Sequence, residues 1–121
     1  RNNELYTLRI SDNIVIRGRV DGIEEEGGNR VLIETKNRRN RLFGCIPEYE
    51  KVQITIYMKM IGVHKAKLVE IYDDQEGVLE YKFDQKFYDE IISKLKKFIN
   101  TVITNNNPQT ITRFLTNIKL N

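Results

Sequence analysis

The sequence predicts an α/β domain in which a mixed five-stranded β-sheet is flanked by helices. Segments with strand and helix patterns follow one another along the 121 residues in the order β-β-β-α-β-β-α. A helix between the third and fourth strands favours a parallel pairing of those two strands, because only a long crossover can bring the chain back in the same direction. The chain length suits one domain with one core.

The composition limits the classes of protein to consider. Hydrophobic residues make up 40% and charged residues 31%, which is typical of a folded globular domain. The formal charge of +3 is too small to indicate nucleic-acid binding by itself. The one cysteine, Cys45, excludes an internal disulfide and any four-cysteine zinc or iron–sulfur site within the chain. With no membrane-spanning apolar run and no signal-peptide pattern, we expect an intracellular protein without membrane contact.

Three strands are predicted in the first third of the chain. Residues 5–10 form the first, and residues 13–23 form a longer second strand that makes a hairpin with it. An acidic, glycine-bearing turn then leads to the third strand, residues 30–36.

A buried helix is predicted from about Pro47 to about Ile61. Proline suits the first turn of a helix, and Glu48 and Glu50 complement its positive N-terminal end. Apolar residues occupy two sides of this helix, which indicates burial on both. They are Ile54, Met58 and Ile61 on one side and Val52, Ile56, Met60 and Val63 on the other.

The rest of the chain contains two strands, 66–72 and 78–83, separated by a turn at residues 73–77. Asp84 is a good N-cap for the long amphipathic helix that follows. We expect residues 1–104 to form the core, and residues 105–121 to form a linker and a short amphipathic helix.

Charged side chains occupy strand ends where apolar residues would be expected. Glu34 and Lys36 lie two apart in the third strand and therefore point to the same side. Asp21 comes at the end of the preceding strand. A carboxylate and an ammonium group are costly to bury without a partner or a purpose. Two carboxylates and the carbonyl of Thr35 can hold Mg²⁺, which prefers oxygen ligands, and Lys36 can orient a water molecule beside it.

Two further groups of residues follow this strand. Arg38, Arg39 and Arg41 lie in a turn-prone segment directly after Lys36, where they form either phosphate contacts or a solvated loop. Gln53 and Tyr57 lie four residues apart on one side of the predicted helix.

Together, these residues resemble the PD-(D/E)XK nuclease superfamily. The matching motifs are Gly18-x-Val20-Asp21, Glu34-x-Lys36 and Gln53-x-x-x-Tyr57, of which the last is typical of the RecB-like, lambda-exonuclease-like branch. The resemblance covers residues 5–83. Val20 replaces the proline of the superfamily name.

The resemblance implies a restriction-endonuclease-like core and a set of roles. Asp21, Glu34 and Thr35 would bind Mg²⁺ or Mn²⁺, and Lys36 would act on the attacking water. Gln53 would contact DNA or help order the active site, and Tyr57 would support it from the same face of the helix. The family usually carries a further acidic or histidine ligand on an upstream helix, which we expect to lie before Arg1 in a longer chain.

We therefore expect a metal-dependent deoxyribonuclease, of the exonuclease type, that acts on single-stranded DNA or a duplex end in recombination, repair or replication. Two alternatives stay open. One is a non-catalytic nucleic-acid-binding module with the same fold, and the other is a structure-specific endonuclease or junction resolvase.

Overall fold

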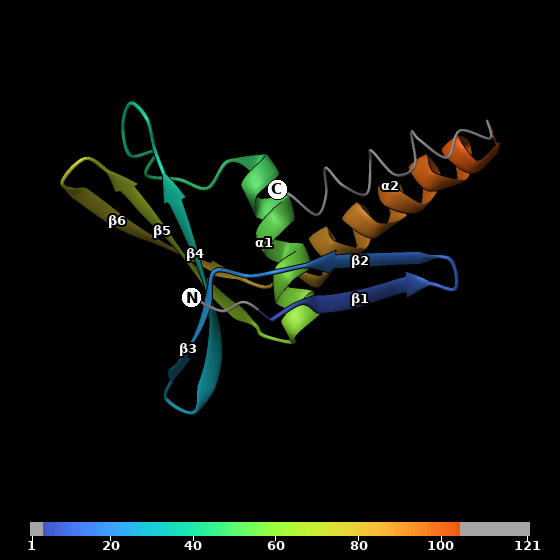
Figure 1. Cartoon of the computed structure of the whole chain (residues 1–121), viewed down its shortest axis with the longest axis horizontal. Coiled ribbons are helices and arrows are strands. Elements are labelled where there is room, and N and C mark those ends of the chain that lie inside the picture. Colours follow the sequence, from blue (N-terminus) through green and yellow to red (C-terminus); the bar gives the residue numbers. More distant parts are fainter. Residues whose placement is uncertain (1–3, 105–121) are drawn as a thin grey trace.

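The computed structural model describes residues 4–104 as six strands and two helices (Figure 1). In chain order they are β1 (Tyr6–Ser11), β2 (Ile14–Gly18), β3 (Gly22–Glu26), β4 (Asn29–Asn37), α1 (Glu48–Ile61), β5 (Lys65–Tyr72), β6 (Gln75–Lys82) and α2 (Gln85–Thr104). The fold is α/β with a mixed sheet flanked by helices, as predicted. The predicted linker and tail helix, residues 105–121, lie outside the described residues.

The mixed sheet has the strand order β3-β4-β5-β6. Strands β4 and β5 are parallel, which confirms the pairing predicted from the helical crossover, and the other two pairs are antiparallel. In the parallel pair Glu34 lies beside Leu68 and Lys36 lies beside Glu70. The carboxyl end of β4 thus shares an edge of the sheet with the carboxyl end of β5.

The prediction of one five-stranded sheet is wrong in the number and pairing of the strands. The expected strand 13–23 is two strands, and β2 pairs with β1 in a separate two-stranded sheet. The chain bends between Gly18 and Gly22 and turns Val20, which is 1% exposed, into the core. Alternation of apolar and polar residues continues across this bend, so the pattern alone could not reveal it.

Helix α1 is buried on two sides, as its two apolar stripes predicted. Its first side packs on the sheet, where Ile54 and Met58 meet Leu32 and Leu68. Its second side carries Ile56, which packs with residues of the β1–β2 hairpin and of α2. Figure 1 shows this arrangement, with α1 between the sheet on one side and the hairpin with α2 on the other.

The ends of the helices follow from local chemistry. Helix α1 starts after Pro47 and stops at Gly62, which takes a positive φ of 74° and donates its N–H to the Met58 carbonyl. The Phe87 N–H donates to the Asp84 carboxylate at 3.1 Å, which confirms Asp84 as the N-cap of α2. Within residues 4–104, neither helix combines the length and the apolar character that crossing a membrane requires.

Gly18 allows the end of β2 to lie directly on the ring of Tyr57. A Cβ atom at this position would be only 3.1 Å from the Tyr57 Cε1 atom. Tyr57 is itself buried in the main core and cannot move aside freely. The tyrosine of the third motif therefore favours a glycine in the first.

We expect the Gly18→Ala substitution to lower the free energy of unfolding by about 1–3 kcal/mol, because the added methyl group overpacks this contact. Urea denaturation measures the change. Gly22→Ala is the matched control, since its Cβ would meet Ile33 Cβ at an ordinary 3.7 Å. Equal effects of the two substitutions would contradict the explanation.

Candidate active site

The candidate site lies at the carboxyl end of β4, on the side of the sheet that faces α1. Leu32 of this strand packs in the core beneath α1. Glu34 and Lys36 follow at intervals of two and therefore project to the same side. Arg38 comes directly after the strand, where its N–H still donates to the Ile71 carbonyl of β5. The strand thus changes from apolar to charged as it leaves the core.

Asp21 and Glu34 are held together by reciprocal hydrogen bonds. The Asp21 N–H donates to Glu34 Oε1 at 3.1 Å, and the Thr35 N–H donates to Asp21 Oδ2 at 3.0 Å. The backbone pairing of β3 with β4 ends at Gly22 and Ile33. Beyond that pair, these two hydrogen bonds join the two stretches of chain in place of backbone–backbone bonds.

Glu34 lies in surroundings that disfavour its negative charge. It is 3% exposed, and this burial raises its pKa to about 7. This value is the net result, because the Asp21 N–H lowers the pKa, the negative charge of Asp21 raises it and the charge of Lys36 lowers it. A bound cation beside the two carboxylates would favour the ionised form of Glu34.

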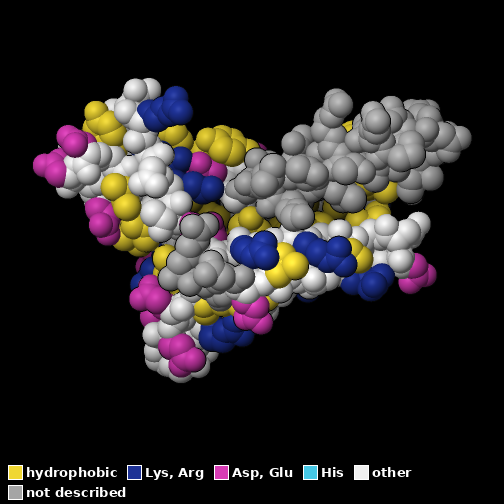
Figure 2. All heavy atoms as spheres, viewed as in Figure 1, with side chains coloured by type: hydrophobic (Ala, Val, Ile, Leu, Met, Phe, Trp, Pro, Cys, Tyr) yellow, Lys and Arg dark blue, Asp and Glu magenta, His cyan; other side chains and the backbone are white. Residues whose placement is uncertain are grey.

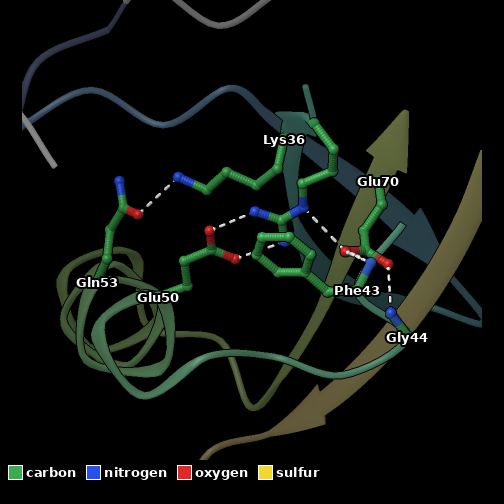
Figure 3. Close-up of polar contacts among 7 residues, drawn as sticks. Lys36, Phe43, Gly44, Glu50, Gln53 and Glu70 are labelled. Carbon is green, nitrogen blue, oxygen red and sulfur yellow. Dashed lines mark hydrogen bonds and ion pairs between the residues drawn. The ribbon is translucent and has the colours of Figure 1, made fainter. Parts of the chain in front are cut away.

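Lys36, Gln53 and Tyr57 continue the cluster onto α1. The Lys36 Nζ atom donates to Gln53 Oε1 at 2.8 Å (Figure 3). Burial raises the pKa of Tyr57, and the charges of Glu34 and Asp21 add to this, while a hydrogen bond with Gln53 opposes it. The structure therefore brings the residues of the three sequence motifs into one connected group.

The predicted role of Arg38 is wrong. We expected a phosphate contact, but its side chain is only 6% exposed and binds two buried carboxylates. Its Nη1 and Nη2 atoms donate to the two oxygens of Glu50 at 2.6 and 2.8 Å, and its Nε atom donates to Glu70 at 2.9 Å (Figure 3). These carboxylates raise the pKa of Arg38 further above its already high value.

Glu70 of β5 is a site residue that sequence reasoning missed. Burial works to raise its pKa, but the N–H groups of Gly44 and Phe43 and the Arg38 guanidinium outweigh burial, and the pKa is lowered. The available signal was its position in the sequence. It continues the buried series Ala66 and Leu68 at an interval of two, where an acid needs a partner.

The segment between β4 and α1 folds over this pair of strands. Glu70 accepts hydrogen bonds from the N–H groups of Phe43 and Gly44, and the Arg38 guanidinium lies 3.8 Å from the centre of the Phe43 ring. Arg39 and Arg41 are exposed on the same segment. Two of the three arginines expected to contact phosphate therefore face solvent.

The donor set at this site fits a hard divalent cation. The candidate ligands are the carboxylates of Asp21 and Glu34 with the carbonyl of Thr35, and Mg²⁺ takes few protein oxygens and keeps several waters. Within residues 4–104, histidine, cysteine and carboxylate side chains do not gather in groups of three or more that could hold a metal ion.

We expect the Arg38→Met substitution to lower the free energy of unfolding by about 3–5 kcal/mol, because it leaves two buried carboxylates without their cation. Chemical denaturation at neutral pH measures this loss. Arg39→Met, at the exposed neighbouring position, should change stability by no more than about 0.5 kcal/mol. A loss of similar size in both variants would contradict the assignment.

In metal-free protein, Glu34 should make stability depend on pH. Because its pKa is raised from 4.5 to about 7, the folded state binds more protons than the unfolded state between these values. Its contribution is greatest below pH 4.5 and is lost as the pH rises through about 7. We expect Glu34→Gln to remove this decline, so that the variant gains stability relative to the wild type on going from pH 4.5 to pH 8. Thermal unfolding in the presence of a chelator measures the stability of both proteins at each pH. Parallel dependence of stability on pH in the two proteins would refute the prediction.

Comparison with known proteins supports the fold only. No family model matches the chain, and no curated protein is significantly similar to it. The solved crystal structure of SSO0001 is similar, with a TM-score of 0.65 and 24% sequence identity. The match covers 89% of this chain and 52% of the other, so the chain spans about half the length of that structure. The two chains share a fold.

Proposed function

We propose that this chain is the core of a Mg²⁺- or Mn²⁺-dependent deoxyribonuclease of the PD-(D/E)XK superfamily, in its RecB-like branch. One observation carries the proposal. Two hydrogen-bonded pairs, Asp21 with Glu34 and Lys36 with Gln53, come from three separate stretches of sequence and lie side by side at the end of β4, where the charge of Lys36 acts on Glu34. A restriction-endonuclease-like core requires this convergence of its three motifs.

The proposed roles follow from the contacts of each residue. Asp21 and Glu34 would hold the metal with the Thr35 carbonyl, and the metal would neutralise the phosphate and lower the pKa of a water. Lys36 would keep its ammonium group directed at that water. Gln53 restricts Lys36 to one direction through the 2.8 Å hydrogen bond, and Tyr57 supports Gln53 from the same helix.

Exposed basic side chains near the site support a nucleic-acid substrate. Arg39 and Arg41 lie on the segment that leaves the site, and Arg17 and Arg19 lie on the chain that approaches Asp21. Figure 2 shows basic side chains over the β1–β2 hairpin and over the segment beyond β4. Contacts of this kind fix the position of a phosphate backbone without reading its sequence.

The same basic residues favour a second candidate, a nucleic-acid-binding module without catalytic activity. Such a module would bind DNA with strong salt dependence and would not cleave it in Mg²⁺ or Mn²⁺. Cleavage therefore separates the two functions.

We expect the wild type to cleave DNA in Mg²⁺ or Mn²⁺, and Asp21→Ala and Lys36→Ala each to reduce the rate by at least about a hundredfold. Gel analysis of linear and circular substrates measures the rates. Degradation confined to the linear substrate indicates an exonuclease, and cleavage of the circular one an endonuclease or resolvase.

Asp12→Ala is the matched control, because this exposed aspartate lies in the turn between β1 and β2. It should cleave at the wild-type rate. Full activity in the folded Asp21→Ala or Lys36→Ala variant would refute the proposed function.

A further inference from the structure

We infer that Arg38 is a positioning residue of the candidate site, and that its paired hydrogen bonds to Glu50 hold Gln53 in place to direct Lys36. The inference rests on the proposed function for its meaning in catalysis. It assigns to Arg38 and Glu50 a role that differs from phosphate binding and from metal binding.

The geometry joins one strand to one helix at two consecutive points. Lys36 lies near the end of β4 and Arg38 comes directly after the strand, two residues later, whereas Gln53 and Glu50 lie three apart on α1. Lys36 binds Gln53 and Arg38 binds Glu50, so strand and helix are linked by two adjacent bridges (Figure 3). A shift of the first turn of α1 would change both bridges together.

The Arg38 bridge is the stiffer of the two. A guanidinium that donates two hydrogen bonds to one carboxylate fixes the orientation of both groups, and both are buried here. Within residues 4–104, the ammonium group of Lys36 is held by one hydrogen bond, from a flexible four-carbon side chain that is only half-buried. The position of Gln53 therefore depends on the bridge one helical turn before it.

A purely stabilising role explains the Arg38 cluster less well. Three charged side chains are buried together, and a buried ion pair often contributes no more stability than apolar residues of the same size. What charged groups add is directional geometry, because two parallel hydrogen bonds have one good arrangement.

The two carboxylates that bind Arg38 hold different elements, so substitutions of Glu50 and Glu70 can be compared with each other. Glu50 links Arg38 to α1, which carries Gln53. Glu70 links Arg38 to β5 and holds the backbone of Phe43 and Gly44 instead. Loss of either carboxylate removes one buried charge, but only loss of Glu50 releases the helix.

The first measurement needs no catalytic activity. Hydrogen exchange of the Lys36 ammonium group, followed by nuclear magnetic resonance in ¹⁵N-labelled protein and assigned with Lys36→Ala, reports its hydrogen bond to Gln53. We expect Glu50→Gln to speed this exchange by about tenfold or more, because the bond is no longer held. Glu70→Gln should leave it close to the wild-type rate.

The second measurement is DNA cleavage at a temperature where every variant is folded. Glu50→Gln should lower kcat by at least about tenfold with little change in KM, since misplacement of a reacting group affects the transition state. Glu48→Gln is the matched control, because it makes the same charge change at an exposed position in the same helical turn. It should retain the wild-type kcat.

Unchanged ammonium exchange in folded Glu50→Gln, or an equal increase in Glu70→Gln, would overturn the inference. An inactive wild type would refute the proposed function instead, and the exchange measurement would still decide whether Arg38 and Glu50 position Lys36. If Glu50→Gln does not fold, the same two measurements are made on Glu50→Asp. This variant keeps the charge, but its side chain is one carbon shorter.

Discussion

The buried guanidinium of Arg38 is the interaction on which the end of the sheet depends. It joins β4 to α1 through Glu50 and to β5 through Glu70, and all three charged groups are removed from water. Burial of unpaired charges would be prohibitively costly, so the three elements can meet only in an arrangement that satisfies every one of these hydrogen bonds. The segment between β4 and α1 obeys the same condition, because Glu70 also accepts the N–H groups of Phe43 and Gly44.

Helix α1 transmits this constraint to the candidate site because it is packed on two sides. Its apolar residues pack against the sheet on one side and against the hairpin and α2 on the other. Tyr57 packs in the core cluster on the sheet side of the helix, and Gln53 lies one turn before it. Gly18 completes the arrangement, since a Cβ atom at this position would lie only 3.1 Å from the Tyr57 Cε1 atom. The position of each polar group is thus set by packing elsewhere on the same helix.

The sequence was informative wherever a local pattern had one solution. Periodicity located α1 and α2, the crossover predicted the parallel pairing of β4 with β5, and the three motifs located the residues that the structure brings together. The bend at Val20 was missed because alternation looks the same in one long strand and in two short ones. Arg38 was misassigned because its partners are 12 and 32 residues away, and spacing along the chain carries no record of such contacts.

Two buried carboxylates on neighbouring strands have opposite pKa shifts because their surroundings differ. Glu34 and Glu70 are 3% and 1% exposed, yet the pKa of the first is raised and that of the second is lowered. Glu70 is compensated in full, because it accepts two N–H groups and the Arg38 guanidinium. Glu34 accepts one N–H group and has the negative charge of Asp21 beside it. A cation would therefore gain little at Glu70 and much at Glu34, because of these two carboxylates Glu34 is the one whose negative charge is poorly compensated. This difference is the physical reason for assigning the proposed metal to the end of β3 and β4 and a structural role to the acids that surround Arg38.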